Sequence, residues 1–285
     1  MTTFRTLAAA CAVSMLALGT VPSHAQPAQA GKDTTTTAPA YVPQSGQAGK
    51  DVVWVPTQDA LVQRMLDMAK VTKEDKLVDL GSGDGRTVIA AAKRGLTARG
   101  IEYNPDLVTL SQRNAEAEGV SDRARFERGD IFEADFSEAT VVTLFLLPEL
   151  NLRLRPTLLN MKPGTRVVSN TFTMDEWTPD ETAVLAENCV NFCRAHFWVV
   201  PAIVAGTWRL GDGELSLKQS FQMLEGTLTR GGKALPITEA RMRGSEISFV
   251  ADGRRYTGTV TDGRMSGRSE GAGQAQDWQA TRSAS

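Results

Sequence analysis

Histidine is scarce in this chain, since His24 and His196 are the two examples among 285 residues. His24 lies in a segment that we expect to be removed, which leaves a single imidazole. One histidine cannot build a histidine-cluster metal site. It also disfavours Ser-His-Asp and Cys-His catalysis, because the base would have to be that one residue. We therefore predict no bound metal and neither of these catalytic arrangements.

Cysteine is also rare: Cys11 lies in the same N-terminal segment, and Cys189 and Cys193 are four residues apart. On a helix this spacing could just permit a disulfide. On a strand the two Cα atoms would lie roughly 13 Å apart, which is too far for one. The surrounding residues favour a strand, and Arg194 is the one adjacent cation that could activate a thiol. We interpret Cys189 and Cys193 as unreactive thiols.

The chain has no excess of one charge, with 31 basic and 33 acidic residues. A broad positive field is therefore missing, which predicts that nucleic acid is not a partner, although a local basic groove is compatible with this balance. The length of 285 residues suits one α/β domain with a smaller companion.

The apolar run Leu7–Val21 is too short and too rich in alanine for a membrane span. Arg5 precedes it, and Ser23-His24-Ala25 follows with the small-x-small pattern of a cleavage site. These features predict a signal peptide over residues 1–25 and a secreted or periplasmic product without stable membrane insertion. Alternatively, the leader stays uncleaved and serves as an anchor.

Residues 26–50 are rich in Ala, Pro, Gln, Thr and Gly, which cannot bury a core. We expect a flexible linker here, with order beginning near Asp51. From residue 51 to residue 201, apolar strands alternate with amphipathic helices. The expected strands cover residues 77–80, 98–102, 123–127, 140–147, 165–173, 182–186 and 191–201. This order predicts an α/β domain with a doubly wound, mostly parallel seven-stranded sheet that ends in an antiparallel edge.

The pattern changes in residues 202–285, where short alternating segments meet at glycine turns. These turns are Gly211-Asp212-Gly213, Gly231-Gly232, Asp252-Gly253 and Asp262-Gly263. We predict a small antiparallel all-β module, a barrel or sandwich with a packed interior.

A glycine-rich turn, Gly81-Ser82-Gly83-Asp84-Gly85, separates an apolar strand from a helix, and the next strand ends at Glu102. This arrangement is typical of a nucleotide-cofactor half-site. A dinucleotide would place its pyrophosphate against the repelling carboxylates of Asp79 and Asp84. S-adenosylmethionine (SAM) instead presents an ammonium and a sulfonium, which carboxylates stabilise. The acids therefore predict SAM as the cofactor and methyl transfer as the reaction.

Each part of SAM has expected partners at the strand ends. Asp79 and the glycine turn should surround the methionine part, where backbone must approach closely. Glu102 should accept both ribose hydroxyls. Asp130, at the end of the third strand, should accept from the adenine amino group. The faces of the adenine should contact Tyr103 and either Ile131 or Phe132.

Residues 51–201 resemble the class I, seven-strand SAM-dependent methyltransferases. The form Asp79-Leu80-Gly81-Ser82-Gly83-Asp84-Gly85-Arg86 is similar to that of the mitochondrial lysine methyltransferases that include the ATP synthase c-subunit enzyme. Further similarity lies in Val55-Pro56-Thr57, Ile101-Glu102-Tyr103-Asn104-Pro105 and Trp177-Thr178-Pro179. The resemblance implies a lysine acceptor; the leader and the β-module depart from that family.

The acceptor should lie at the end of the fourth strand, which reads Leu146-Leu147-Pro148-Glu149-Leu150-Asn151. It lacks an Asn-Pro-Pro-Tyr arrangement, which argues against adenine or glutamine methylation. We predict Glu149 and Asn151 as the residues that orient an amine, although Glu149 also suits the start of a helix. The expected acceptor channel consists of Trp54, Thr57, Leu147, Pro148 and Trp177. Alternatively, the two tryptophans fill gaps between helix and sheet.

The sequence thus predicts an exported SAM-dependent methyltransferase that N-methylates a protein lysine or another amine. Two alternatives stay open: a small-molecule methyltransferase with a pocket capped by the β-module, and a non-catalytic binding protein that keeps the fold. The oligomeric state has no signal in the sequence.

Overall fold

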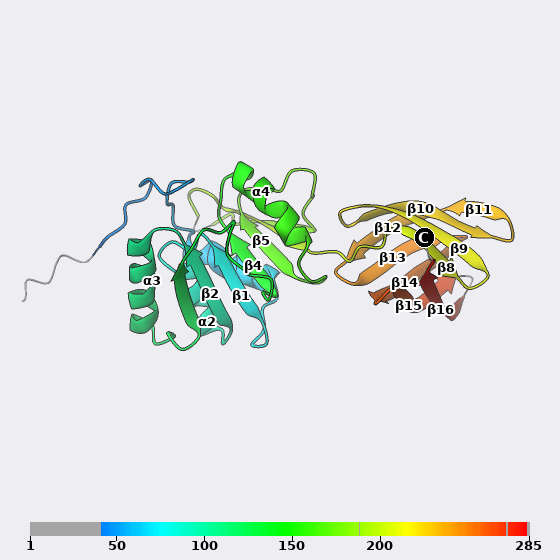
Figure 1. The fold of residues 1–285 in the computed structure, drawn as a ribbon, viewed down its shortest axis with the longest axis horizontal. Helices are drawn as coiled ribbons and strands as arrows, with labels where there is room; N and C mark the ends of the chain where they lie inside the picture. Colours follow the sequence, from blue (N-terminus) through cyan, green and yellow to red (C-terminus); the bar gives the residue numbers. More distant parts are fainter. Residues whose placement is uncertain (1–40, 188, 272, 284–285) are drawn as a thin grey trace, which may run out of the picture. The chain divides into compact units, whose positions relative to one another are not determined.

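The computed structural model describes residues 41–187, 189–271 and 273–283 (Figure 1). The expected signal peptide over residues 1–25, and the expected linker as far as residue 40, lie outside the described residues. Within the described part of the chain, no helix is long and apolar enough to cross a membrane.

The first sheet has seven strands in the order β3-β2-β1-β4-β5-β7-β6. Its strands are β1 (Lys76–Leu80), β2 (Thr97–Glu102), β3 (Ala124–Arg128), β4 (Val141–Leu144), β5 (Arg166–Asn170), β6 (Glu181–Val184) and β7 (Arg194–Val199). Strands β1 to β5 are parallel, and β7 pairs antiparallel with β5 and β6. This confirms the predicted doubly wound sheet. The strand order reverses between β1 and β4, where ligands bind in such folds, outside the carboxyl ends of the strands.

Among the described residues, four helices accompany this sheet: α1 (Asp59–Met68), α2 (Arg86–Lys93), α3 (Pro105–Ala117) and α4 (Pro148–Leu159). Adjacent strand residues point to opposite faces, and each face has its own core. Leu77 and Val141 belong to the apolar cluster that includes α1, α2 and α3. Val78 and Val142 belong to the cluster that includes α4. Because the central strands are buried on both faces, they appear in the sequence as continuous apolar runs.

The start of α3 follows the sequence closely. The Asn104 side chain accepts a hydrogen bond from the Asp106 backbone N–H at 2.9 Å, and Pro105 occupies the first turn. The Asn104 side chain supplies an acceptor, and Pro105 has no N–H that would need one, so both features satisfy this helix end. The cap of α3 therefore fixes the chain directly after the acidic end of β2.

The second sheet has nine antiparallel strands and forms a barrel, because β9 pairs with β10 as well as with β8. Its strands are β8 (Gly206–Leu210), β9 (Gly213–Ser220), β10 (Met223–Arg230), β11 (Lys233–Pro236), β12 (Thr238–Arg243), β13 (Glu246–Ala251), β14 (Arg254–Thr261), β15 (Arg264–Gly271) and β16 (Gln274–Arg282). Side chains fill the interior: Phe249 and Tyr256 stack at 4.6 Å between ring centroids, with Trp278 edge-on to both. This confirms the predicted all-β module.

A polar and aromatic contact joins the β-module to the segment that follows β5. The Trp177 ring stacks on Phe221 with centroids 6.3 Å apart, and Gln222 Nε2 donates to the Thr178 carbonyl oxygen at 2.7 Å. The Asp180 carboxylate accepts from the Val199 backbone N–H at 2.8 Å and from Arg241 Nη2 at 2.6 Å. Asp180 is nearly buried, so its two partners replace the water that it loses.

We expect Asp180→Ala to lower the stability of the protein by about 2 kcal/mol, because the substitution removes a charge-assisted hydrogen bond and leaves the Val199 N–H unpaired. The measurement is the midpoint of urea unfolding. Asp277→Ala is the matched control, since Asp277 is exposed and pairs with Arg268 at 3.7 Å, an ion pair worth roughly 0.5 kcal/mol or less. Equal shifts of the urea midpoint for the two variants would contradict a stabilising contribution of the Asp180 hydrogen bonds.

Two expectations about local structure need correction. Residues 41–50, expected as flexible linker, are part of a turn: the Gly46 N–H donates to the Trp54 carbonyl oxygen at 2.8 Å, and the Trp54 N–H donates to that of Gln47 at 2.9 Å. Cys189 and Cys193 are joined by a disulfide with Cα atoms 5.6 Å apart. The prediction of two free thiols was wrong, because the chain forms a loop there and β7 begins at Arg194.

Candidate functional site

A cavity lies at the carboxyl ends of β1, β2, β3 and β4, where the strand order reverses. Its lining brings together most of the residues predicted from the sequence. These are Trp54, Thr57, Asp79, Gly81, Ser82, Gly83, Asp84, Glu102, Tyr103, Asp130 and Ile131. Within the described residues, the lining does not include Gly85, Phe132, Leu147, Pro148, Glu149, Asn151 or Trp177.

The glycine turn is shaped by left-handed backbone, with φ of 55° at Gly83 and 84° at Gly85. A Cβ at Gly83 would lie 2.5 Å from the indole nitrogen of Trp54, which covers the turn. A Cβ at Gly85 would lie 2.6 Å from Ser111 Cβ and 2.7 Å from the Phe126 ring. Gly85 was expected beside the cofactor; it instead allows the turn to pack against α3 and β3.

The Glu102 carboxylate is held by two backbone donors. The Gly83 N–H donates to Oε2 at 2.9 Å, and the Asn104 N–H donates to Oε1 at 2.9 Å. Both oxygens are therefore fixed in place between the glycine turn and the start of α3. Each oxygen keeps a further lone pair, so the carboxylate is oriented for a pair of neighbouring hydroxyl groups.

Asp79 is the most buried acid of the cavity. Its Oδ1 accepts a hydrogen bond from Thr143 Oγ1 at 2.6 Å. Burial raises the pKa of Asp79 to about 7; the charges of Glu102 and Asp84 act in the same direction, and the Thr143 bond opposes them. A cationic group placed beside Asp79 would relieve this penalty and lower the pKa of its carboxyl.

This pKa predicts pH-dependent cofactor binding. Because the ammonium of S-adenosylhomocysteine favours ionised Asp79, binding should release a proton when the pH is below about 7. We expect the affinity to rise roughly five- to tenfold between pH 6 and pH 7.5. Calorimetry in buffers of different ionisation enthalpy measures both the affinity and the proton release. Asp79→Asn should remove the pH dependence, and an unchanged slope in that variant would contradict this assignment.

Asp84 is paired with Arg86. Arg86 Nε and Nη2 donate to the two Asp84 oxygens at 3.0 and 2.6 Å, and Nη1 donates to the Thr57 carbonyl oxygen at 2.8 Å. The pair raises the pKa of Arg86. Asp84 lies at the cavity as predicted, but Arg86 balances its charge. The pair therefore ties the glycine turn to the chain that enters α1.

The end of the cavity that lies at β2 and β3 is formed by Tyr103, Asp130 and Lys50. Asp130 pairs with Lys50 and accepts from the Phe132 N–H at 3.0 Å, and the ion pair lowers the pKa of Asp130. Lys50 Nζ lies 5.1 Å from the centroid of the Tyr103 ring. Sequence reasoning missed Lys50, because it falls in the segment expected to be flexible. Phe132 turns away, with the Arg153 guanidinium 3.6 Å from its ring centroid.

The other end of the cavity is apolar and includes Leu144, Phe145, Leu146 and Leu150. The predicted catalytic pair does not meet there. Glu149 is exposed in the first turn of α4, where a carboxylate favours the helix dipole. Leu147 and Pro148 beside it are exposed as well.

Asn151 is fully buried, and its amide nitrogen lies 3.2 to 3.3 Å from Ser169 Oγ and from the carbonyl oxygens of Phe172 and Thr173. It therefore shapes the segment after β5 rather than orienting an amine. Trp177 is also fully buried, between Trp198 and Phe221. Of the two tryptophan alternatives, gap filling holds for Trp177, whereas Trp54 lines the cavity.

The lining fits SAM. Ser82 Oγ is buried at the cavity and has no hydrogen-bond partner among the described residues. The two Glu102 oxygens are held in an orientation that suits the two ribose hydroxyls of SAM. The ammonium of SAM would stabilise the ionised form of the buried Asp79 carboxyl. The fold and these acids define a SAM-dependent methyltransferase.

Comparison with known proteins agrees with this. The family model of the ANTKMT methyltransferase domain matches residues 79–181. The chain is 45% identical over 143 residues to a protein-lysine N-methyltransferase of Saccharolobus islandicus, which covers 49% of this chain and 89% of that protein. The chain belongs to this methyltransferase family.

Two further relatives extend the comparison. The human lysine N-methyltransferase of the ATP synthase c-subunit is 39% identical over 128 residues, covering 45% of this chain and 54% of that enzyme. The chain thus spans about half the length of that relative. A crystal structure described as an RNA methyltransferase from Salinibacter ruber, in complex with S-adenosyl-L-homocysteine, is 49% identical with a TM-score of 0.50, covering 53% of this chain and 96% of that one.

Proposed function

We propose that this methyltransferase acts on the ε-amine of a lysine in a protein acceptor. The observation that carries the proposal is the character of the cavity, which combines an acidic cofactor end with an apolar acceptor end. Of the residues that the structure describes, five acids line it, namely Asp51, Asp79, Asp84, Glu102 and Asp130, against two bases, Lys50 and Arg86. Such a lining attracts a cationic acceptor and repels a polyanionic one. The names of two relatives, both protein-lysine N-methyltransferases, support the same class.

The residues at the cavity perform two tasks. Glu102, Asp79 and Asp130 would hold the ribose, the ammonium and the adenine of SAM, which supplies an electrophilic methyl group on its sulfonium. At the apolar end, Leu144, Phe145 and Leu146 exclude water and disfavour the charged form of a lysine side chain. A neutral amine has the lone pair that methyl transfer requires. Alignment of this amine in a dry site is therefore the main catalytic contribution of the protein.

Thr57 is a polar residue of the cavity lining, two residues before α1 begins. Its Oγ1 accepts from Asn170 Nδ2 at 3.1 Å, and Asn170 is itself fully buried. The hydroxyl is thereby held in one orientation at the end of β5. We propose that Thr57 helps to position the amine, in place of Glu149 and Asn151.

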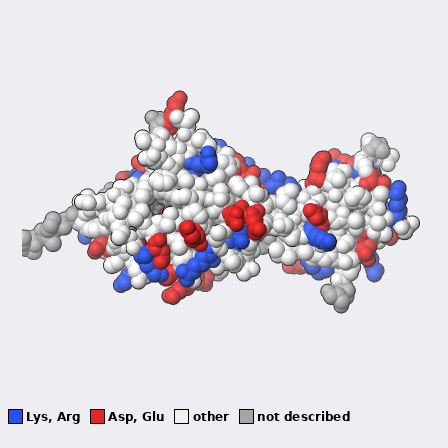
Figure 2. All heavy atoms as spheres, turned by 90° about the horizontal axis from the view of Figure 1, so that it is seen from above, with Lys and Arg blue, Asp and Glu red and all other residues white. Residues whose placement is uncertain are grey.

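The structural relative described as an RNA methyltransferase makes RNA the competing acceptor. RNA binding depends on Lys and Arg side chains that neutralise phosphates. On the face that Figure 2 shows, Lys and Arg side chains of the described residues are interspersed with Asp and Glu rather than gathered together. The charges of the lining also oppose phosphate, so the protein acceptor is favoured.

The acceptor class can be tested with the purified chain, isotopically labelled SAM, and separate fractions of protein, RNA and small molecules from the same cells. We expect label on protein lysines, identified by mass spectrometry as one, two or three added methyl groups, and loss of that label with Glu102→Ala. Label that is removed by ribonuclease would replace the lysine proposal with RNA. Label that stays in the small-molecule fraction would support the alternative of a small acceptor.

We further propose that the protein acts after export. The N-terminal pattern over residues 1–25 supports this, and so does the Cys189–Cys193 disulfide, because such bonds persist in oxidising compartments. Fractionation of cells with alkylation of free thiols tests both points. We expect the protein in the envelope or secreted fraction, beginning at Gln26, with both cysteines protected from alkylation. A full-length, alkylated protein in the cytosol would contradict export.

A further inference from the structure

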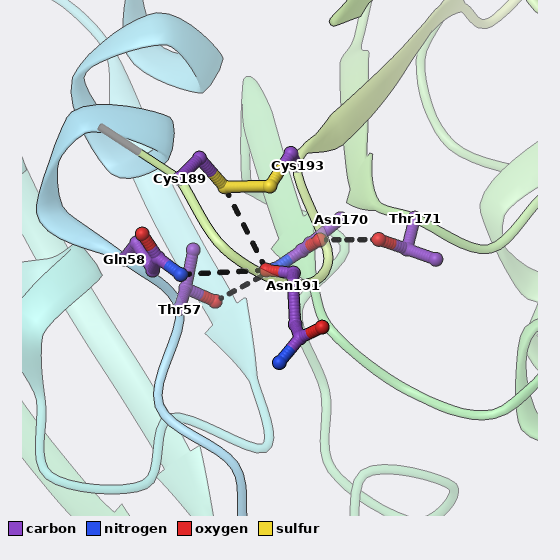
Figure 3. The surroundings of a disulfide bond; sticks show 7 residues. All are labelled: Thr57, Gln58, Asn170, Thr171, Cys189, Asn191 and Cys193. Carbon is purple, nitrogen blue, oxygen red and sulfur yellow. Dashed lines mark hydrogen bonds between the residues drawn. A yellow bond between two sulfur atoms is a disulfide. The ribbon is translucent and has the colours of Figure 1, made fainter. Parts of the chain in front are cut away.

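The disulfide-closed loop between β6 and β7 lies beside the acceptor end of the cavity. Cys189 and Cys193 enclose three residues, Val190, Asn191 and Phe192. Figure 3 shows this loop next to Thr57 and Gln58, at the start of α1, and next to Asn170, at the end of β5. Gln58 Nε2 donates to the Asn191 carbonyl oxygen at 3.5 Å. The loop thus borders the place where Thr57 joins the cavity lining.

Phe192 extends from this loop into an aromatic group. Its ring meets Phe145 edge-on, with centroids 5.2 Å apart, and lies 6.3 Å from Phe172. Phe145 and Phe172 stack with centroids 6.3 Å apart. We name Phe145, Phe172 and Phe192 the aromatic wall. Because Phe145 lines the cavity, the wall continues the apolar end of the cavity outward.

The loop holds Phe192 in an unusual conformation. Its φ is 57°, in the left-handed region that bulky residues rarely adopt. Phe192 is 41% exposed as a residue, although its ring contacts two other aromatic rings. A short loop closed by a disulfide has few conformations, so the bond keeps Phe192 against Phe145 and limits its escape into solvent. Core packing does not explain this unfavourable backbone conformation, because Phe192 is half-exposed and contributes little to the core.

We propose that the disulfide loop forms part of the acceptor entrance, and that the aromatic wall receives the lysine side chain of the acceptor. This inference rests on the proposed lysine specificity. The alkyl chain of lysine packs on the rings, and the ring faces attract its ammonium before transfer and the methylated ammonium afterwards. The ammonium releases one proton to solvent at this entrance, and the neutral amine then reaches the apolar end of the cavity beyond Phe145. The cofactor end, at Glu102 and Asp130, is formed by other strand ends and does not involve the loop.

The test uses the full protein with a blocked Gly-Lys-Gly peptide as acceptor and S-adenosylhomocysteine as cofactor probe. Phe192→Ala should raise KM for the peptide about tenfold, change kcat less than threefold, and leave the Kd for S-adenosylhomocysteine within twofold. Phe192→Tyr should restore KM, because it keeps the ring. Val184→Ala is the matched control: Val184 lies on β6, outside the loop, and is 61% exposed, so its truncation should leave KM unchanged.

Cutting the loop open tests the role of the disulfide separately. The double variant Cys189→Ser with Cys193→Ser should raise KM in the same direction as Phe192→Ala, without weakening S-adenosylhomocysteine binding. An unchanged KM for the peptide in Phe192→Ala overturns the proposal that the aromatic wall receives lysine. If the Kd for S-adenosylhomocysteine rises as much as KM does, the loop has a purely structural role, and the proposal is overturned as well. If the wild-type protein methylates RNA and no lysine, the proposed function and this inference both fail. Lysine methylation with an unchanged KM in Phe192→Ala rejects the inference alone.

Discussion

Glu102→Ala is expected to weaken binding of S-adenosylhomocysteine about 30-fold or more, which corresponds to about 2 kcal/mol. The loss follows from the geometry of one carboxylate. The backbone N–H groups of Gly83 and Asn104 hold its two oxygens, each at 2.9 Å, and leave them directed at the cavity. Alanine removes both ribose acceptors and also leaves these two donors without their partner. Isothermal titration calorimetry measures the loss.

Glutamine at position 102 should not rescue binding. Two backbone donors converge on the two oxygens of Glu102, so an amide NH₂ would face an N–H on one side. We therefore expect Glu102→Gln to lose affinity nearly as strongly as Glu102→Ala. Glu127→Ala is a suitable control, because Glu127 is an exposed acid on the neighbouring strand that pairs with Arg99 at 3.3 Å. A change of less than threefold in Glu102→Ala would remove Glu102 from the cofactor site.

The cofactor end of the site could be predicted from sequence because it depends on strand ends. Parallel strands place their carboxyl ends at one edge of the sheet, so Asp79, Glu102 and Asp130 had to lie close together once three buried strands were recognised. The choice of SAM followed from the charge of these residues, and the comparisons confirm it. Their individual contacts with the cofactor stay predictions.

The apolar end of the cavity, where we propose that the acceptor binds, could not be predicted in the same way, because it depends on segments without periodicity. Asn151 and Trp177 are polar or aromatic residues near the right strand end, but tertiary packing directs both into the interior. Phe192 reaches Phe145, at the apolar end of the cavity, through a loop whose left-handed turn and disulfide have no signature in a four-residue cysteine spacing. Lys50 likewise reaches Asp130 across 80 residues of sequence, from a segment with the composition of a linker.

Gly85→Ala is expected to lower the stability of the protein by about 3 kcal/mol or more, the largest effect of a single added methyl group that we foresee. Two costs combine. A φ of 84° is unfavourable for any residue with a Cβ, which costs about 1 to 3 kcal/mol. The added Cβ also meets Ser111 Cβ at 2.6 Å and the Phe126 ring at 2.7 Å, where overpacking costs about 1 to 3 kcal/mol.

Gly119→Ala separates these two costs. Gly119 has a φ of 66°, and a Cβ there would meet no atom within 4 Å, so this variant carries the backbone cost alone. The urea midpoint of Gly85→Ala should therefore fall clearly below that of Gly119→Ala. Equal midpoints would mean that α3 and β3 move away from the glycine turn at little cost. Because the same turn presents the Gly83 N–H to Glu102, the close approach of Gly85 to Ser111 and Phe126 links the packing of the domain to the position of the carboxylate that we predict to bind the ribose.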